Sequence, residues 1–196
     1  MALFHNKYRI ESTRLKNWDY ARQGAYFITI CTKDRIHYFG EIENGKMNYS
    51  PIGAIADVLW YEIKNRTNNV ELGEFVVMPN HIHGILFLID NPIVETLHAT
   101  SLQQLPKPHL QIPTNENMGK ISPKKGSVST IIRSYKSALT KHANRLGLDF
   151  LWQSRFHDHI IRDDKSFNNI TEYILNNPLT WAADKFNNSH KNTKPC

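Results

Sequence analysis

Long hydrophobic runs, cysteine pairs and a leader-like N-terminus are all missing from this sequence of 196 residues. The longest apolar stretches are far too short to cross a bilayer, and residues 1–7 lack the basic-then-apolar order of a signal peptide. Two cysteines, Cys31 and Cys196, are too few for a disulfide framework or a cysteine-based zinc cluster. These absences predict a cytoplasmic protein without a membrane partner.

Composition and charge further narrow the class of protein. Hydrophobic residues make up 40% and charged residues 21% of the chain, which is typical of a folded globular protein. We expect one catalytic domain over residues 1–186 and a polar tail over 187–196, with fraying from about Phe186. The 24 Lys and Arg against 18 Asp and Glu leave a net charge of +6, which favours a polyanionic partner without identifying it.

Local patterns predict alternating strands and helices. Asn44-Gly45 and Pro79-Asn80 are turn dipeptides between β-prone runs, and Ser50 before Pro51 is a typical helix start. The expected strands are 25–32, 36–43, 46–49, 72–78, 81–88 and 157–162, and the expected helices are 51–65, 127–146 and 165–176. This order predicts an α+β fold in which helices cover an antiparallel sheet, and it fits a doubly wound parallel sheet poorly.

The stretch at about 90–128 departs from this regular pattern. It is rich in proline and polar residues and has little periodic hydrophobicity. We therefore expect a mobile insertion within the domain.

The tripeptide His81-Ile82-His83 is the first candidate for chemistry. Residues i and i+2 of a strand face the same side, so the two imidazoles are placed to hold one metal ion. The alternative is that both histidines merely occupy a half-exposed sheet face.

Tyr173 and Asn177 form a second candidate. Four residues apart on a helix, they share one face, where the amide oxygen suits Mg²⁺ or Mn²⁺ and the phenol suits nucleophilic attack on phosphate. Alternatively, Tyr173 is an aromatic at the edge of the core and Asn177 ends a helix before Pro178. Tyr135 is a rival nucleophile, but its neighbours favour packing and no amide follows it four residues later.

Three separated segments carry a resemblance to a known family. Val76-Val77-Met78-Pro79-Asn80-His81-Ile82-His83-Gly84-Ile85-Leu86, residues 152–162 (WQSRFHDHIIR) and residues 173–178 (YILNNP) together resemble the IS200-like transposases. More narrowly, they are similar to the REP-associated tyrosine transposases, which are single-tyrosine HUH nucleases. The resemblance extends from about residue 14 to 182, excepting the proline-rich stretch.

The resemblance implies a fold, a reaction and a set of site residues. The implied fold is a ferredoxin-like or RRM-like antiparallel sheet covered by helices. His81, His83 and Asn177 would hold Mg²⁺ or Mn²⁺, and Tyr173 would attack DNA to form a 5′-phosphotyrosine. The implied function is that of a metal-dependent single-stranded DNA endonuclease and strand transferase acting at hairpin-forming repeats.

Basic residues near this candidate site predict contacts with DNA. We expect phosphate contacts from Arg133, Lys136, Arg155 and Arg162, although each of them alone also fits a solvated surface. His157 and His159 are expected to shape the site or contact DNA. The predicted partner is single-stranded DNA with a hairpin, bound by a monomer or homodimer. A nucleic-acid-binding protein that does not cleave, and a metal-dependent phosphohydrolase without a covalent intermediate, remain as alternatives.

Overall fold

The computed structural model of this protein describes residues 3–4, 7–8, 18–89 and 123–187. Most of the insertion expected at 90–128, and the tail from residue 188 onward, lie outside the described residues, so those expectations stay predictions. None of the described helices is long and apolar enough to cross a membrane.

The centre of the fold is a four-stranded antiparallel sheet. Its strands are β3 (Gly24–Cys31), β6 (Val70–Met78), β7 (His81–Leu88) and β8 (His157–Ile161). They lie in the order β6-β7-β3-β8, so β7 and β3 are the two inner strands of the sheet. One helix separates β3 from β6 and another separates β7 from β8, which gives the ferredoxin-like βαββαβ arrangement.

Among the described residues, three α-helices accompany the sheet, and a side chain caps the start of each. They are α1 (Pro51–Arg66), α3 (Val128–Arg145) and α4 (Asp164–Asn176). The Ser50 hydroxyl accepts a hydrogen bond from the Gly53 amide at 3.0 Å, and the Asp163 carboxylate accepts one from the Ser166 amide at 2.8 Å. Such caps satisfy amide groups that have no partner within the helix, which fixes where each helix starts.

A separate hairpin, β4 (Gly40–Glu43) with β5 (Lys46–Tyr49), precedes α1. Asn44 and Gly45 both have positive φ, 51° and 73°, as a type I′ turn requires. The strand expected from residue 36 starts only at Gly40. The Phe39 amide donates to the Pro79 carbonyl at 3.0 Å, so the preceding residues follow the β6–β7 turn instead of a strand partner.

The remaining elements are short. They are β1 (Leu3–Phe4), β2 (Lys7–Tyr8), and the 3₁₀ turns η1 (Lys33–Arg35) and η2 (Trp181–Ala183). The turn η1 follows the end of β3, and η2 follows α4. Both therefore lie close to the segments that carry the candidate chemistry.

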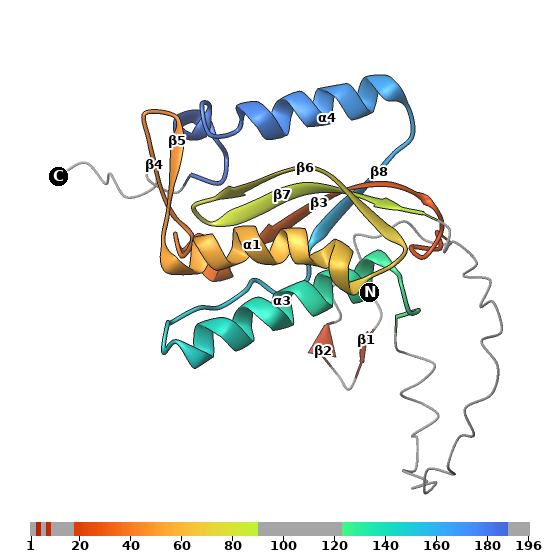
Figure 1. Cartoon of the computed structure of the whole chain (residues 1–196), viewed down its shortest axis with the longest axis horizontal. Helices are drawn as coiled ribbons and strands as arrows, with labels where there is room; N and C mark the ends of the chain where they lie inside the picture. The colour runs from red at the N-terminus through yellow and green to blue at the C-terminus, as the bar shows by residue number, and fades with distance from the viewer. Residues whose placement is uncertain (1–2, 5–6, 9–17, 90–122, 188–196) are drawn as a thin grey trace, which may run out of the picture.

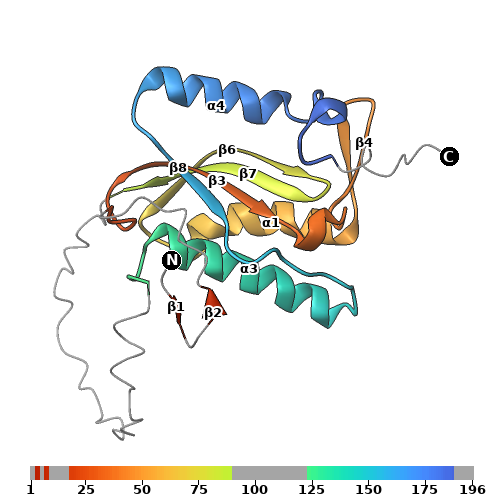
Figure 2. The same cartoon turned by 180° about the vertical axis from the view of Figure 1, so that it is seen from behind.

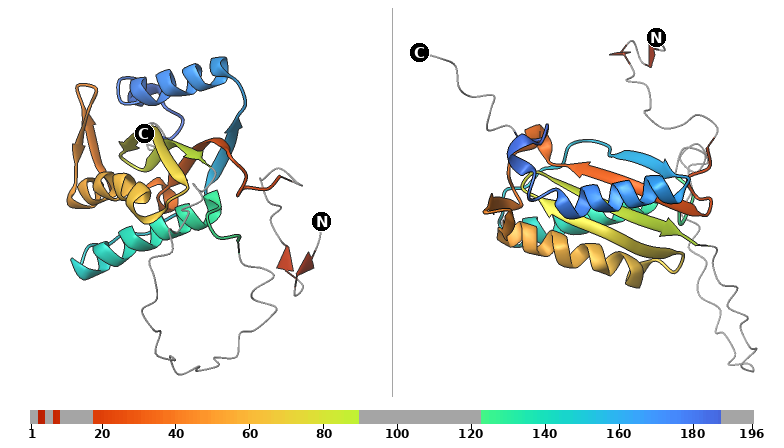
Figure 3. Two further views of the ribbon diagram at one scale, coloured as in Figure 1. Left: turned by 45° about the vertical axis from the view of Figure 1, so that its right-hand side comes forward. Right: turned by 90° about the horizontal axis from the view of Figure 1, so that it is seen from above.

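The helices cover the two faces of the sheet unequally. α1 and α3 lie together on one face, and α4 lies alone on the opposite face (Figures 1 and 2). Viewed from above, α4 runs over the strands (Figure 3). The larger core, which includes Tyr26, Ile28, Trp60, Leu86 and Tyr135, lies on the α1 and α3 side. A smaller core of Ile85, Ile161 and Ile174 lies beneath α4.

Strand alternation decides which side of β7 carries chemistry. Ile82 and Leu86 belong to the larger core, whereas Ile85 belongs to the core beneath α4. His81 and His83 share the face of Ile85, because successive side chains point to opposite sides of a strand. Gly84 faces Trp60 so closely that a β-carbon would lie 2.2 Å from the indole Cζ2. The missing side chain lets β7 lie directly on α1 and fixes the position of the two histidines.

Candidate active site

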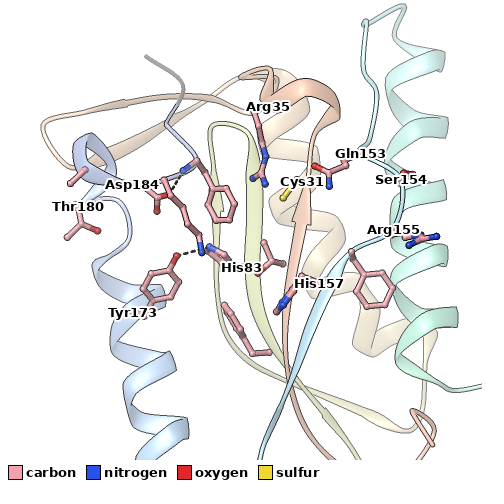
Figure 4. A pocket seen from close by; sticks show the side chains of 16 residues that line it. Cys31, Arg35, His83, Gln153, Ser154, Arg155, His157, Tyr173, Thr180 and Asp184 are labelled. Carbon is pink, nitrogen blue, oxygen red and sulfur yellow. Dashed lines mark hydrogen bonds between the residues drawn. The ribbon is translucent and has the colours of Figure 1, made fainter. Parts of the chain in front are cut away.

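The central contact of the site joins the strand β7 to the helix α4. The Tyr173 hydroxyl lies 3.2 Å from Nε2 of His83, and the phenol points from α4 toward the sheet (Figure 4). The ring packs edge-on against Phe27, while 40% of the residue stays exposed. The phenol oxygen is thus held at the sheet face in a position that solvent and substrate reach.

His81 is held in one orientation by Asn80. The Asn80 amide nitrogen donates to the carbonyl oxygens of Arg35 and Phe186, at 3.0 and 2.8 Å. Its oxygen therefore faces Nδ1 of His81, 2.8 Å away, and accepts a hydrogen bond from that nitrogen. This arrangement leaves Nε2 of His81 with a free lone pair, and this buried atom has no hydrogen-bond partner within the described residues.

Burial keeps both imidazoles neutral. The pKa of His81 is lowered well below its usual value, first by burial and then by the neighbouring His83. Burial also lowers the pKa of His83 to about 3, aided by the charges of Lys185 and Arg35. His83 is anchored through Nδ1, which lies 2.9 Å from the Thr29 hydroxyl. The two rings, with centroids 4.5 Å apart, present neutral nitrogen atoms of the kind that bind metals.

Asn177 lies one turn after Tyr173 and is completely buried. It ends α4 as a capping residue, and its backbone N–H donates to the Ile174 carbonyl. Its side-chain amide, however, has no hydrogen-bond partner at either polar atom among the residues described here. Burial and the Asp184 charge raise the pKa of Tyr173, while the Asn177 amide opposes that shift. Helix termination thus explains the Asn177 backbone but not its side chain.

These donors form a chemically suitable set for a divalent metal. Nε2 of His81 and Oδ1 of Asn177 are buried and unpartnered in the described chain, and Nε2 of His83 faces only the Tyr173 hydroxyl. Imidazole nitrogens and an amide oxygen are established metal ligands. No cluster of three His, Cys, Asp or Glu side chains suited to a metal occurs in the described part of the chain. Within the described residues, a three-ligand set at the two histidines would therefore need a donor of another kind, such as the Asn177 amide oxygen.

A cavity of about 910 Å³ opens beside Tyr173 and His83. Sequence reasoning missed several residues that line it, among them Arg35, Gln153, Lys185 and Phe186. Phe186, where fraying was expected to begin, is instead packed into the site, and the tail from residue 188 lies outside the described residues. The Phe186 ring packs on His81 with centroids 4.6 Å apart, and the Arg35 guanidinium lies 4.0 Å from the same ring centroid. No local pattern in the sequence marks these contacts, because they join distant segments.

The four basic residues predicted to bind DNA are not gathered at the cavity. Arg155 lines it, whereas Arg133 and Arg162 are exposed and do not line it. The Lys136 ammonium donates to the backbone carbonyls of Gln153 and Arg155, at 2.7 and 3.0 Å. Lys136 thus holds the segment before β8 in place, and a DNA contact by any of the four stays a prediction.

Tyr135 lies in the larger core, on the face of the sheet opposite α4. Its hydroxyl donates to the Ala56 carbonyl at 2.8 Å, and burial raises its pKa well above the usual value. A buried phenol with its oxygen already engaged is a poor nucleophile. Of the two other histidines, His157 lines the cavity, and both His157 and His159 line an adjacent surface depression.

The chain is similar to known proteins over most of its length. No protein-family model matches the chain. A Haemophilus influenzae protein named "Uncharacterized protein" is 36% identical over 180 residues, covering 89% of this chain and 91% of that protein. A second protein of that organism, named "Putative REP-associated tyrosine transposase", is 25% identical over 174 residues, covering 82% of this chain and 73% of its own.

A solved structure shares the fold. It is a REP-associated tyrosine transposase bound to a REP hairpin, with a TM-score of 0.53 and 17% sequence identity. The match covers 93% of this chain and 84% of that one.

Proposed function

We propose that this chain is an IS200-like transposase of the REP-associated tyrosine type, and that it cleaves and rejoins single-stranded DNA through Tyr173. The proposed activity is that of a metal-dependent endonuclease and strand transferase that forms a 5′-phosphotyrosine. The observation that carries the proposal is the Tyr173 hydroxyl, 3.2 Å from His83 Nε2 and next to a second buried histidine.

The proposed reaction is a transesterification in two directions. The Tyr173 oxygen attacks the phosphorus, the bond to the 3′-oxygen breaks, and the departing strand ends in a 3′-hydroxyl after taking up a proton. The phosphodiester energy is kept in the tyrosine ester. A second strand's 3′-hydroxyl then attacks that ester, which reseals the DNA and returns the phenol.

His81, His83 and Asn177 would hold the metal in this proposal. When bound, Mg²⁺ or Mn²⁺ would polarise the phosphate and neutralise charge that develops on it. All three side chains are neutral: the amide of Asn177 carries no charge, and the lowered pKa values of His81 and His83 keep their rings unprotonated. These three ligands therefore contribute no charge to balance the cation, and we expect the DNA phosphate to contribute it.

Three observations support hairpin-bearing DNA as the substrate. The chain is basic, with a net charge of +6, and the structural relative with the same fold was solved with a REP hairpin. The cavity beside Tyr173 is lined by Phe27 and Phe156, whose rings suit stacking of unpaired bases. Recognition of a single strand beside a hairpin fits this combination of charge and aromatic surface.

The test begins with a pool of labelled single strands, each with a hairpin and randomised flanks. The protein is incubated with this pool and Mg²⁺ or Mn²⁺, and material that stays on the protein after denaturation is sequenced. We expect a covalent adduct that depends on the metal and on single-stranded flanks. Cleavage without an adduct would favour a phosphohydrolase, and binding without cleavage would favour a non-cleaving DNA-binding protein.

A further inference from the structure

We propose that Arg35 binds the DNA phosphodiester that lies beside Tyr173, with Lys185 as the neighbouring cation. This inference rests on the proposed function, because it assigns the substrate contact in the same cavity. Both residues line the cavity that also contains His83 and Tyr173. Neither belongs to the metal-ligand set or to the four basic residues that the sequence indicated.

The first observation is an unsatisfied guanidinium nitrogen. Nη1 of Arg35 is buried and has no hydrogen-bond partner within the described residues. A buried donor on a charged group is costly to leave unpaired, so such an atom indicates a missing acceptor. Arg35 enters the cavity from the segment after β3 and points toward its interior (Figure 4). The missing acceptor is therefore expected inside the cavity.

The second observation is the charge around the unsatisfied donor. Arg35 and Lys185 lie over the Phe186 ring, 4.0 and 5.0 Å from its centroid. Within the described part of the chain, neither Arg35 nor Lys185 takes part in an ion pair. The nearby Asp184 carboxylate accepts a hydrogen bond from the Phe186 amide at 2.7 Å. Two cations thus share one cavity without a carboxylate paired to them, which favours an anionic ligand.

The third observation is the backbone that holds Arg35. Its φ is 59°, in the left-handed region that non-glycine residues rarely adopt, and Asp34 before it has φ 52°. The Asn80 side chain holds the Arg35 carbonyl at 3.0 Å and the His81 ring at 2.8 Å. The Asn80 amide thus holds both the strained backbone of Arg35 and the ring of His81, a candidate metal ligand. Such strain beside a candidate site indicates a functional constraint. The strain directs the guanidinium into the site.

A phosphodiester fits these features better than other anions. The guanidinium fork matches two oxygens of a phosphate, and its charge is permanent. Arg35 and Lys185 line the same cavity as His83 and Tyr173, and Nε2 of His83 lies 3.2 Å from the Tyr173 hydroxyl. The cationic pair and the phenol therefore face one space in which a single phosphate group fits.

The experiment measures binding and cleavage separately. Binding is measured in the Tyr173→Phe background with single strands from the hairpin pool in which one linkage at a time is an uncharged methylphosphonate. When Arg35 is present, only one methylphosphonate should weaken DNA binding, by about tenfold. It is the one at the linkage that the wild-type protein cleaves. In Tyr173→Phe/Arg35→Gly the same replacement should weaken binding much less, because Lys185 still faces the phosphate.

The variants are chosen to separate function from folding. Glycine relieves the left-handed strain at position 35, so Arg35→Gly should fold at least as stably while its cleavage rate falls about 100-fold. Arg35→Lys keeps the charge without the fork and should recover part of the rate. Arg66→Ala removes an equal charge from an exposed position at the end of α1. It should change neither the effect of the methylphosphonate on DNA binding nor the cleavage rate.

Two results would overturn the assignment. In the first, the methylphosphonate weakens DNA binding by Tyr173→Phe/Arg35→Gly as much as it weakens binding by Tyr173→Phe. In the second, a folded Arg35→Gly cleaves DNA at the wild-type rate. If Arg35→Gly fails to fold, the same penalty is measured in Arg35→Gln. A wild-type protein that binds with this penalty but never forms an adduct would contradict the proposed cleavage and leave the phosphate site standing.

Discussion

The Asn80 side chain fixes the ring of its neighbour His81, with Oδ1 and Nδ1 2.8 Å apart. The amide nitrogen is committed to two backbone carbonyls, so the oxygen faces the ring and the proton belongs on Nδ1. Nε2 is consequently left as a lone-pair donor. One buried amide thereby links the loop after β3, the segment after α4 and the candidate metal site.

Replacing Asn80 by Ala should weaken the metal site and the fold together. The change removes the partner of His81 Nδ1 and leaves the partly buried carbonyls of Arg35 and Phe186 without their donor. We expect Mn²⁺ affinity to fall roughly 10- to 100-fold and unfolding free energy to fall by about 2 kcal/mol. Calorimetric titration and urea unfolding check the two effects. Asn65→Ala, at an exposed position of α1, is the control, and unchanged Mn²⁺ affinity in Asn80→Ala would argue against the orienting role.

Asn177→Ala should separate metal binding from stability. The buried amide has no hydrogen-bond partner among the described residues, so its removal costs the fold little, and unfolding free energy should change by less than about 1 kcal/mol. Mn²⁺ binding, followed by electron paramagnetic resonance, should be largely lost. A large loss of stability with normal Mn²⁺ binding would instead make Asn177 a structural residue.

Because the donor set is neutral, metal and DNA should bind cooperatively. We expect Mn²⁺ to bind Tyr173→Phe at least about tenfold more tightly when a hairpin-bearing single strand is present. The same spectroscopic titration, with and without DNA, measures this coupling. Equal affinity in both titrations would mean that the DNA phosphate does not complete the site.

Gly84→Ala tests how β7 is positioned. The new β-carbon would lie 2.2 Å from the Trp60 indole in the larger core, and we expect a loss of about 3 kcal/mol in urea unfolding. Gly147→Ala is the matched control, because its φ is +65° but nothing lies within 4 Å of the new atom. That control should lose only about 1 kcal/mol, from backbone conformation alone. Equal losses would show that the Trp60 contact does not restrict position 84.

Lys136→Met and Arg155→Ala should have different effects on the salt dependence of DNA binding. Lys136 donates to two backbone carbonyls, so its loss should lower stability by about 2 kcal/mol and leave the salt dependence of DNA binding unchanged. Arg155 lines the cavity, and its loss should reduce the log–log salt slope by about 1. Binding titrations at several salt concentrations distinguish the two, and a reduced slope for Lys136→Met would assign that lysine to DNA.

Local signals in the sequence predicted the elements, and long-range contacts completed the site. Asn44-Gly45 and Ser50 act on their immediate neighbours, so the turn and the start of α1 were predictable from them alone. The period-two spacing of His81 and His83 likewise placed both rings on one sheet face. By contrast, Asn80 meets Phe186 across a separation of 106 residues, and no periodicity reports such a contact. Arg35 was missed for the same reason, since its place in the cavity depends on that network.

The measurement that tests the central claim most directly is the identity of the residue that carries DNA after cleavage. The protein–DNA adduct is digested with nuclease and protease, and mass spectrometry locates the remaining nucleotide. We predict a 5′-linked nucleotide on the peptide that contains Tyr173, absent from Tyr173→Phe and retained in Tyr135→Phe. A nucleotide on Tyr135, or metal-dependent cleavage by Tyr173→Phe at the wild-type rate, would contradict the account.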